Sequence, residues 1–175
     1  MKYVRLFLLV LATAMCTISG FAQDVHTDYD HHANFERFHT YSWMKVASDN
    51  PLWQQRISDA VDQALQAKGW QKVPEGGDIA ITAVGAVQNQ QEYQTFYSGF
   101  GRGWRWGGFG PETTTNVVNY RVGELVVDLY DQHSQRLVWR GTSSDTLSDK
   151  PEKNEEKLDK AVKKMFDKFP PEEKG

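Results

Sequence analysis

The spacing of apolar residues changes along this chain, and that change is the strongest constraint on its fold. Over residues 51–65 and 158–169, apolar residues recur at three- and four-residue intervals, as on one face of an α-helix. Over residues 79–87 and 124–140 they alternate with polar ones, as in strands with one buried face. This order predicts an α+β fold: a mostly antiparallel sheet with two amphipathic helices packed on one face, a two-layer sandwich.

Both predicted helices carry end signals. Asn50 is a favourable N-cap, Pro51 suits the first helical position, and Gly69 suits the left-handed residue after the helix. Pro170 and Pro171 stop the second helix. The expected buried faces are Trp53, Ile57, Ala60, Val61, Ala64 and Leu65 in the first helix, and Leu158, Ala161, Val162, Met165, Phe166 and Phe169 in the second.

The strand patterns predict an exposed and a buried side for each strand. Ile79, Ile81 and Ala83 form one such side. Further on, a polar turn at residues 131–135 separates two alternating runs, which predicts a β-hairpin with one covered face. The expected covered positions of this hairpin are Leu125, Val127, Leu129, Leu137 and Trp139.

The N-terminus has the order of a secretory signal peptide. Lys2 and Arg5 precede a short, mostly apolar run, and Gly20-Phe21-Ala22 forms a small-x-small cleavage site. The run is too short to span a bilayer. We therefore expect a signal peptide at residues 1–22, then a single α+β domain at residues 23–175 without a transmembrane segment, exported to the periplasm or secreted.

The charge and the cysteine content of the chain argue against some classes of partner and site. Loss of residues 1–22 removes Lys2 and Arg5 and no acid, so the formal charge moves from −3 to −5. An acidic domain argues against a nucleic-acid partner. The only cysteine, Cys16, lies in the leader, where Met15 is too large for a lipoprotein cleavage site. Lipid anchoring at Cys16 is thus less favoured than soluble export, and the mature chain has no thiol for catalysis or metal binding.

Residues 93–110 interrupt the strand pattern with interleaved glycines and aromatic residues. Between two strands, such a segment predicts a long loop or hairpin tip, and long loops are often functional. Its aromatics could stack on sugar rings, insert at a membrane interface with the arginines near headgroups, or anchor a protein partner. The candidate binding residues are Tyr97, Phe100, Arg102, Trp104, Arg105, Trp106 and Phe109.

Three segments together resemble the DUF4136 family of bacterial envelope proteins. They lie near the predicted mature N-terminus, along the predicted hairpin, and at the end of the last helix: residues 28–30, 34–35 and 40–43; residues 123–128, 131 and 137–141; and residues 169–171. The resemblance implies an α+β domain in an envelope or secreted location. The family is one of unknown function, so it implies no catalytic residues.

Polar clusters give little support to catalysis. His31 and His32 are adjacent on an expected extended piece and point opposite ways, so we expect no metal site and no cofactor. Glu124 and Asp128 share a strand face but lie roughly 13 Å apart at the rise of a strand. That distance is too large for a carboxylate pair, and we expect a structural role for Asp128, for instance with Arg140.

The sequence therefore favours a non-enzymatic exported domain of the envelope that binds an envelope protein, a glycan or a membrane surface through its aromatic-glycine segment. The alternative is a hydrolase of envelope polymers. It would need two or more of Glu124, Asp128 and His133 to lie within hydrogen-bond reach in one cleft. A third reading is a structural, stress-related envelope protein without a small ligand.

We expect the exported protein to begin at Gln23, because the leader's best cleavage site ends at Ala22. Intact-mass measurement of protein recovered after export tests this directly. A mass that includes diacylglycerol on Cys16 would contradict the expectation and would make the protein membrane-anchored.

Overall fold

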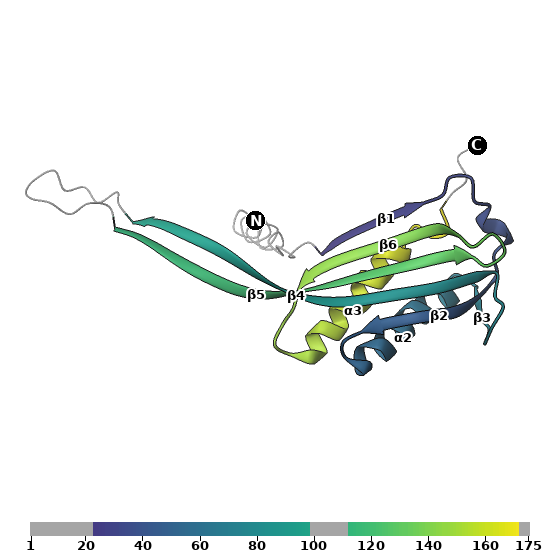
Figure 1. Ribbon diagram of the computed structural model, residues 1–175, viewed down its shortest axis with the longest axis horizontal. Coiled ribbons are helices and arrows are strands. Elements are labelled where there is room, and N and C mark those ends of the chain that lie inside the picture. Colours follow the sequence, from purple (N-terminus) through teal and green to yellow (C-terminus); the bar gives the residue numbers. More distant parts are fainter. Residues whose placement is uncertain (1–22, 99–111, 172–175) are drawn as a thin grey trace, which may run out of the picture.

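One mixed, mostly antiparallel sheet of six strands organises the molecule, with the order β1-β6-β5-β4-β2-β3 (Figure 1). The structure, a computed structural model, describes residues 23–98 and 112–171, and the side chains of these ranges outside 92–98 and 112–118. β2 runs parallel to β3 and β4, and the other pairs are antiparallel. The strands are β1 Asp24–Tyr29, β2 Thr40–Ser48, β3 Gln71–Lys72, β4 Ile79–Ser98, β5 Glu112–Asp131 and β6 Arg136–Thr146.

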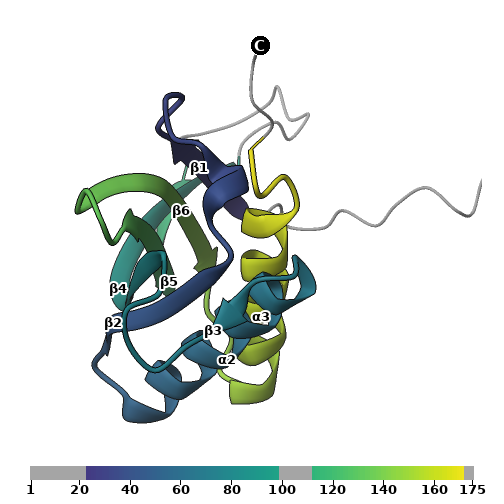
Figure 2. The same ribbon diagram turned by 90° about the vertical axis from the view of Figure 1, so that its right-hand side faces the viewer.

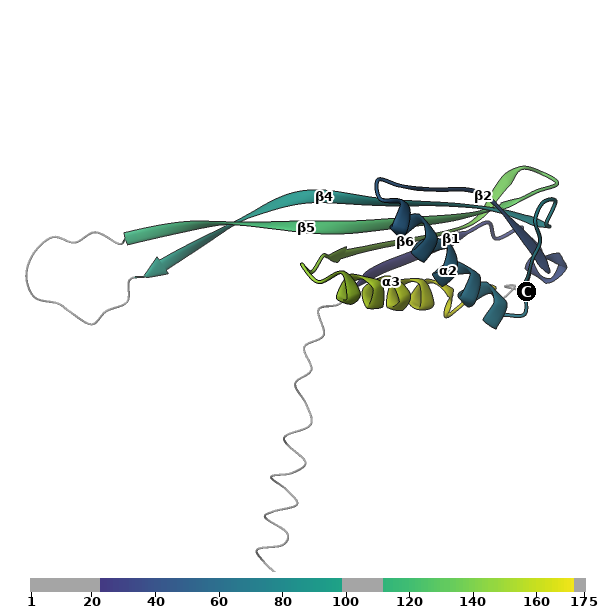
Figure 3. The ribbon, with the colours of Figure 1, turned by 90° about the horizontal axis from the view of Figure 1, so that it is seen from below.

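Two helices, α2 (Pro51–Ala67) and α3 (Pro151–Phe166), lie side by side against one face of the sheet (Figures 2 and 3). α2 packs on β2 and β4, while α3 packs on β1 and β6. The predicted end signals of α2 are confirmed: the Asn50 side chain accepts a hydrogen bond from the Leu52 N–H at 3.0 Å, and Gly69 has φ of 86°. The α+β class is likewise confirmed.

The covered face of the sheet carries rows of apolar side chains in register. Ile81 on β4 lies opposite Leu129 on β5, which lies opposite Trp139 on β6, and all three are buried. Two residues along β6, a Cβ at Gly141 would lie 2.5 Å from the Trp139 ring and 3.0 Å from Met165 Sδ. The missing side chain at Gly141 therefore lets α3 pack directly on the sheet.

The expected alternation along β6 is wrong at its start. The pairing shifts between Leu129 and Tyr130, because Leu129 pairs with Trp139 whereas Tyr130 pairs with Leu137. Val138 is thus the extra residue of a β-bulge. Val138 and Trp139 are both buried, and Leu137, which we expected to be covered, is 37% exposed.

An aromatic cluster closes the end of the sheet at which α3 finishes. Phe169, just beyond α3, lies with its ring centroid 5.9 Å from that of Phe35, 5.2 Å from Trp70, 5.4 Å from Trp139 and 5.3 Å from Phe166. Most of these contacts are edge-to-face, the favourable arrangement for aromatic pairs. The cluster joins four segments in one buried unit. They are the short 3-10 helix η1 (Phe35–Arg37), the chain between α2 and β3, strand β6 and helix α3.

A buried carboxylate fastens α2 to the sheet. Asp62 accepts hydrogen bonds from Tyr41 Oη at 3.0 Å, Trp43 Nε1 at 2.9 Å and Lys72 Nζ at 2.7 Å. Burial raises the pKa of Tyr41, and its hydrogen bond to Asp62 raises it further. The sequence pattern gave no indication of this contact, because Asp62 lies outside the predicted apolar stripe of the helix.

We expect Ile57→Ala or Leu65→Ala to lower the free energy of unfolding by about 2–5 kcal/mol, because each truncation leaves a cavity in the core. Both side chains are almost fully buried beneath the sheet. Urea unfolding measures the loss, with Gln63→Ala on the exposed side of α2 as a control that should change little. An unchanged midpoint in both core variants would contradict the packing of α2 described above.

Candidate functional site

β4 and β5 continue far beyond the rest of the sheet as a two-stranded ribbon (Figure 1). β2 pairs with β4 only as far as Gly85, and β6 pairs with β5 only from Val122 onward. Past these positions the two strands pair with each other, out to Ser98 and Glu112. At the rise of a strand, residues 86–98 would span roughly 40 Å. We call this part, residues 86–98 and 112–121, the ribbon.

The predicted binding segment belongs to the far end of the ribbon. We expected a loop over residues 93–110, but residues 93–98 are strand, because β4 runs to Ser98. Tyr97 pairs along the backbone with Thr113 near that end. The other candidates fall in the chain that joins β4 to β5 and lie outside the described residues: Phe100, Arg102, Trp104, Arg105, Trp106 and Phe109.

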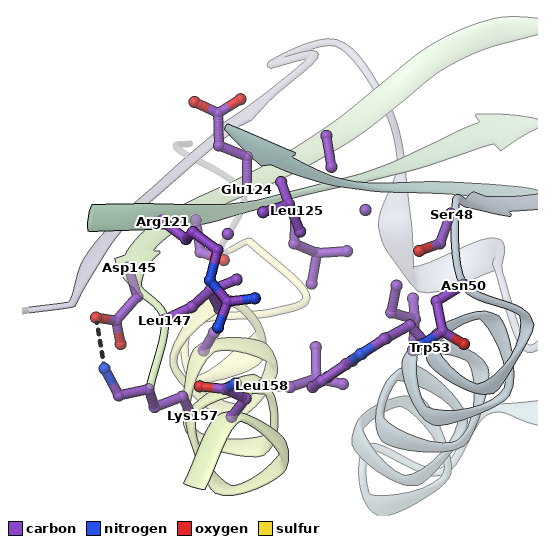
Figure 4. Close-up of a pocket in the computed structure, with 18 of the residues that line it drawn as sticks. Ser48, Asn50, Trp53, Arg121, Glu124, Leu125, Asp145, Leu147, Lys157 and Leu158 are labelled. Carbon is purple, nitrogen blue, oxygen red and sulfur yellow. Dashed lines mark hydrogen bonds and ion pairs between the residues drawn. The ribbon is translucent and has the colours of Figure 1, made fainter. Parts of the chain in front are cut away.

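A cavity of about 290 Å³ lies at the root of the ribbon, between the sheet and the starts of α2 and α3 (Figure 4). Its lining is mainly apolar. Two glycines shape it: a Cβ at Gly85 would come within 2.8 Å of Ile57 Cδ1, and one at Gly123 within 2.8 Å of Leu147 Cδ2. The main apolar lining residues are Trp53, Ile57, Val87, Leu125, Leu147, Leu158 and Ala161.

Five charged residues also line this root cavity, and two of them, Lys157 and Asp145, pair with each other. Lys157 Nζ lies 3.0 Å from Asp145 Oδ1 and donates to the Thr146 carbonyl at 2.6 Å. Arg121 makes a longer contact of 3.3 Å with the exposed Asp149. Apolar walls with paired charges at the mouth favour binding of an apolar group over acid–base chemistry.

The N-terminal residue of the described chain also lies at this rim. Gln23 lines the cavity, its side-chain amide donates to the Lys157 carbonyl at 2.8 Å, and its own carbonyl accepts from Lys164 Nζ at 2.9 Å. Two contacts with α3 therefore hold the start of the folded domain beside the root of the ribbon.

The carboxylates considered for hydrolysis do not form one cleft. Asp128 lies on the face of the sheet away from the helices and receives two hydrogen bonds from Arg140, at 2.6 and 2.7 Å. These bonds and the charge of Asp128 raise the pKa of Arg140. Glu124 instead accepts from Gln88 at 3.0 Å, and the His133 N–H donates to Asp131 in the turn after β5.

The histidines do not gather around a common point in the described part of the chain. His26 lies 2.9 Å from Asp24 on β1, and the His31 ring packs edge-on against Tyr29. Among the described residues, no three metal-ligating side chains come together. His31 therefore has an ordinary packing role at the start of the fold.

Sequence reasoning missed the root cavity. Its walls come from β2, β4, β5, β6 and both helices, so its members are scattered along the sequence. A usable signal was present in Gly85 and Gly123, which interrupt two strand patterns, since a glycine within a strand often marks a close approach or an opening.

Comparison with known proteins identifies the family. A family described as "Domain of unknown function (DUF4136)" matches residues 25–171, so the chain belongs to this family. No curated protein of assigned function matches it significantly. Among the described residues, no helix has the length and apolar character needed to cross a membrane.

One solved structure shows a similar fold at low sequence identity, and a second gives a weaker match. A PDZ domain protein from Parabacteroides distasonis matches with a TM-score of 0.58 and 15% identity over 94% of this chain, and the match covers 40% of that chain. The PelC dodecamer from Paraburkholderia phytofirmans gives a TM-score of 0.48 and 14% identity over 83% of this chain and 95% of its own. The first likeness concerns the fold alone, and the second is too weak to support an argument.

We expect Asp128→Asn to lower the free energy of unfolding by about 1–3 kcal/mol, because it replaces a nearly buried carboxylate that binds Arg140 through both oxygens. The control is Glu124→Gln, which keeps an acceptor for Gln88 on the same strand face and should unfold like the unchanged protein. Urea unfolding at neutral pH gives both values. Equal stability in all three proteins would remove the structural role of Asp128.

Proposed function

We propose that this protein is an exported, non-enzymatic binding domain of the cell envelope that contacts its partner through the far end of the ribbon. The body, which is the sheet and its two helices, serves as the support. The aromatic-glycine segment that joins β4 to β5 serves as the contact surface. The leader sequence with its cleavage site supports the exported location.

The observation that carries this proposal is the length of β4 and β5 beyond their neighbours. Both strands are 20 residues long, whereas β2 has 9 and β6 has 11. A two-stranded ribbon alone is only marginally stable in water. Its extension thus adds little to folding, and its effect is to hold the connecting segment far from the core.

The composition of that segment supports a binding role. Trp104, Trp106 and Phe109 are residue types that dominate binding hot spots, and Arg102 and Arg105 add hydrogen-bond donors. Such a set suits an envelope protein, a glycan on which the rings stack, or an anionic membrane surface. The body offers no competing catalytic arrangement among the described residues, because Glu124, Asp128 and His133 have separate partners.

The test is the double variant Trp104→Ala with Trp106→Ala, compared with the unchanged protein for retention on three separate targets. The targets are purified peptidoglycan, vesicles of anionic phospholipid, and an array of envelope proteins. We expect retention on one target to fall by at least about tenfold, as for loss of a hot-spot aromatic, with little change in thermal unfolding.

A matched control removes exposed apolar surface from the body instead. Met44→Ala with Leu137→Ala truncates two exposed side chains away from the ribbon. This control should bind like the unchanged protein. If the tryptophan variant melts many degrees lower, its side chains belong to the core and the proposal fails. If it melts and binds normally on all three targets, the segment is a spacer and the proposal also fails.

A further inference from the structure

The outer edge of β4 is open along the whole ribbon. Within the described residues, β2 is the last strand to pair with this edge, and its final pair is Ser48 with Gly85. From Ala86 to Ser98, the backbone groups on this side therefore have no strand partner in the described part of the molecule. Such an edge is a template for pairing with a further strand.

The sequence of this edge lacks the residues that usually prevent such pairing. Natural edge strands are blunted by lysine, by proline, or by short length. Residues 86–98 contain no lysine, arginine or proline, and their only charge is Glu92. They are mainly amides, hydroxyls and aromatics, which suit a paired strand. The edge therefore carries one charge that opposes pairing with a second copy, Glu92, which would face its own counterpart if residue 86 paired with residue 98, and its other residues favour pairing.

The outer edge of β5 is less available. The pairing of β6 with β5 continues one residue past β6, because the Leu147 N–H donates to the Arg121 carbonyl at 2.7 Å. Arg121 also contacts Asp149. The open stretch of β5 is thus shorter than that of β4 and bears a charge at each end, Glu112 and Arg121. The comparison singles out β4 as the pairing edge.

The root cavity lies where a strand added to β4 would end. Such a strand would pair with the same edge of β4 that β2 pairs with in the body. Its end would therefore lie next to the residues that follow Ser48, the last residue of β2. Asn50 and Trp53 line the cavity there, together with Val87, which is 55% exposed (Figure 4). Leu52 in the same turn is 66% exposed. An added strand would cover this apolar surface.

We propose that two copies of this chain pair antiparallel through residues 86–98 of β4, with the Ser98 end of each strand beside the root cavity of the other. Antiparallel pairing of an edge with itself is the two-fold, self-complementary arrangement common in dimers. It joins the two ribbons into four strands, which exceeds the minimum for a stable sheet. A second copy is the favoured occupant because each chain supplies both the open edge and the apolar surface at its end.

This inference goes beyond the proposed function, and it does not depend on what the tip of the ribbon binds. Antiparallel pairing would point the two aromatic-glycine segments in opposite directions. Failure of the dimer would leave a monomeric binding domain intact, and failure of envelope binding would leave the dimer intact.

The first test measures the dimer dissociation constant of the chain beginning at Gln23, which contains every described element, by sedimentation over a wide concentration range. Gln90→Lys with Gln91→Lys places like charges on the pairing edge, and should raise the constant by at least about tenfold. The control, Gln63→Lys with Gln132→Lys, adds the same charge at exposed positions off the ribbon and should leave it unchanged. Circular dichroism checks that both variants fold.

The second test locates the edge. The only cysteine, Cys16, is absent from the chain that begins at Gln23, so single introduced cysteines report contacts between copies. Under mild oxidation, at least one of Gln91→Cys, Glu92→Cys and Tyr93→Cys should form a disulfide-linked dimer, because pairing of residue 86 with residue 98 places residue 92 opposite its own copy. Asn119→Cys, on β5 directly opposite Gln91, should not. The Trp104→Ala with Trp106→Ala protein should still dimerise.

Several results would overturn the proposal. A monomer at every concentration excludes the pairing. A dimer that the paired lysines do not weaken, or one that Asn119→Cys links and the β4 cysteines do not, uses another surface. Loss of the dimer in the tryptophan variant would assign self-association to the tip of the ribbon instead of its edge.

Discussion

The Phe169 aromatic cluster is the contact on which the arrangement of the body depends. Phe169 touches the rings of Phe35 in the short 3-10 helix η1 (Phe35–Arg37), Trp70 between α2 and β3, Trp139 in β6 and Phe166 in α3. These four segments are far apart in sequence, and burial of their rings brings them to one end of the sheet. Once that end is fixed, α2 and α3 must run along the same face, with their starts at the opposite end, where the root cavity lies and the ribbon leaves the body.

Periodicity was sufficient to predict the elements whose neighbours repeat the same pattern. The stripe containing Ile57, Val61 and Leu65 and the alternation of Leu125, Val127 and Leu129 follow directly from burial of one face. Periodicity failed at Val138, because a bulge adds one residue and moves Leu137 to the exposed face. A bulge depends on how a partner strand twists, which local spacing does not record.

For the candidate site too, some features could be predicted from the sequence and others could not. The aromatic-glycine segment is predicted from its composition, which differs from everything around it, and its binding role stays a prediction. The extent of β4 was not, because residues 88–94 are mainly amides without alternation, and their strand conformation depends on pairing with β5. The root cavity depends on packing between elements: Gly85 and Leu147 become its walls only when the chain folds, so no local pattern encodes it.

The separation between the ribbon and the aromatic cluster has an evolutionary consequence. Most substitutions in a protein are removed because they destabilise it, so a surface tied to the core can change only slowly. The far end of β4 and β5 lies beyond every helix and every other described strand (Figure 3). Residues there are free to vary with little effect on folding. Related chains can therefore keep one body while this extension changes, so divergence in this family should concentrate between β4 and β5.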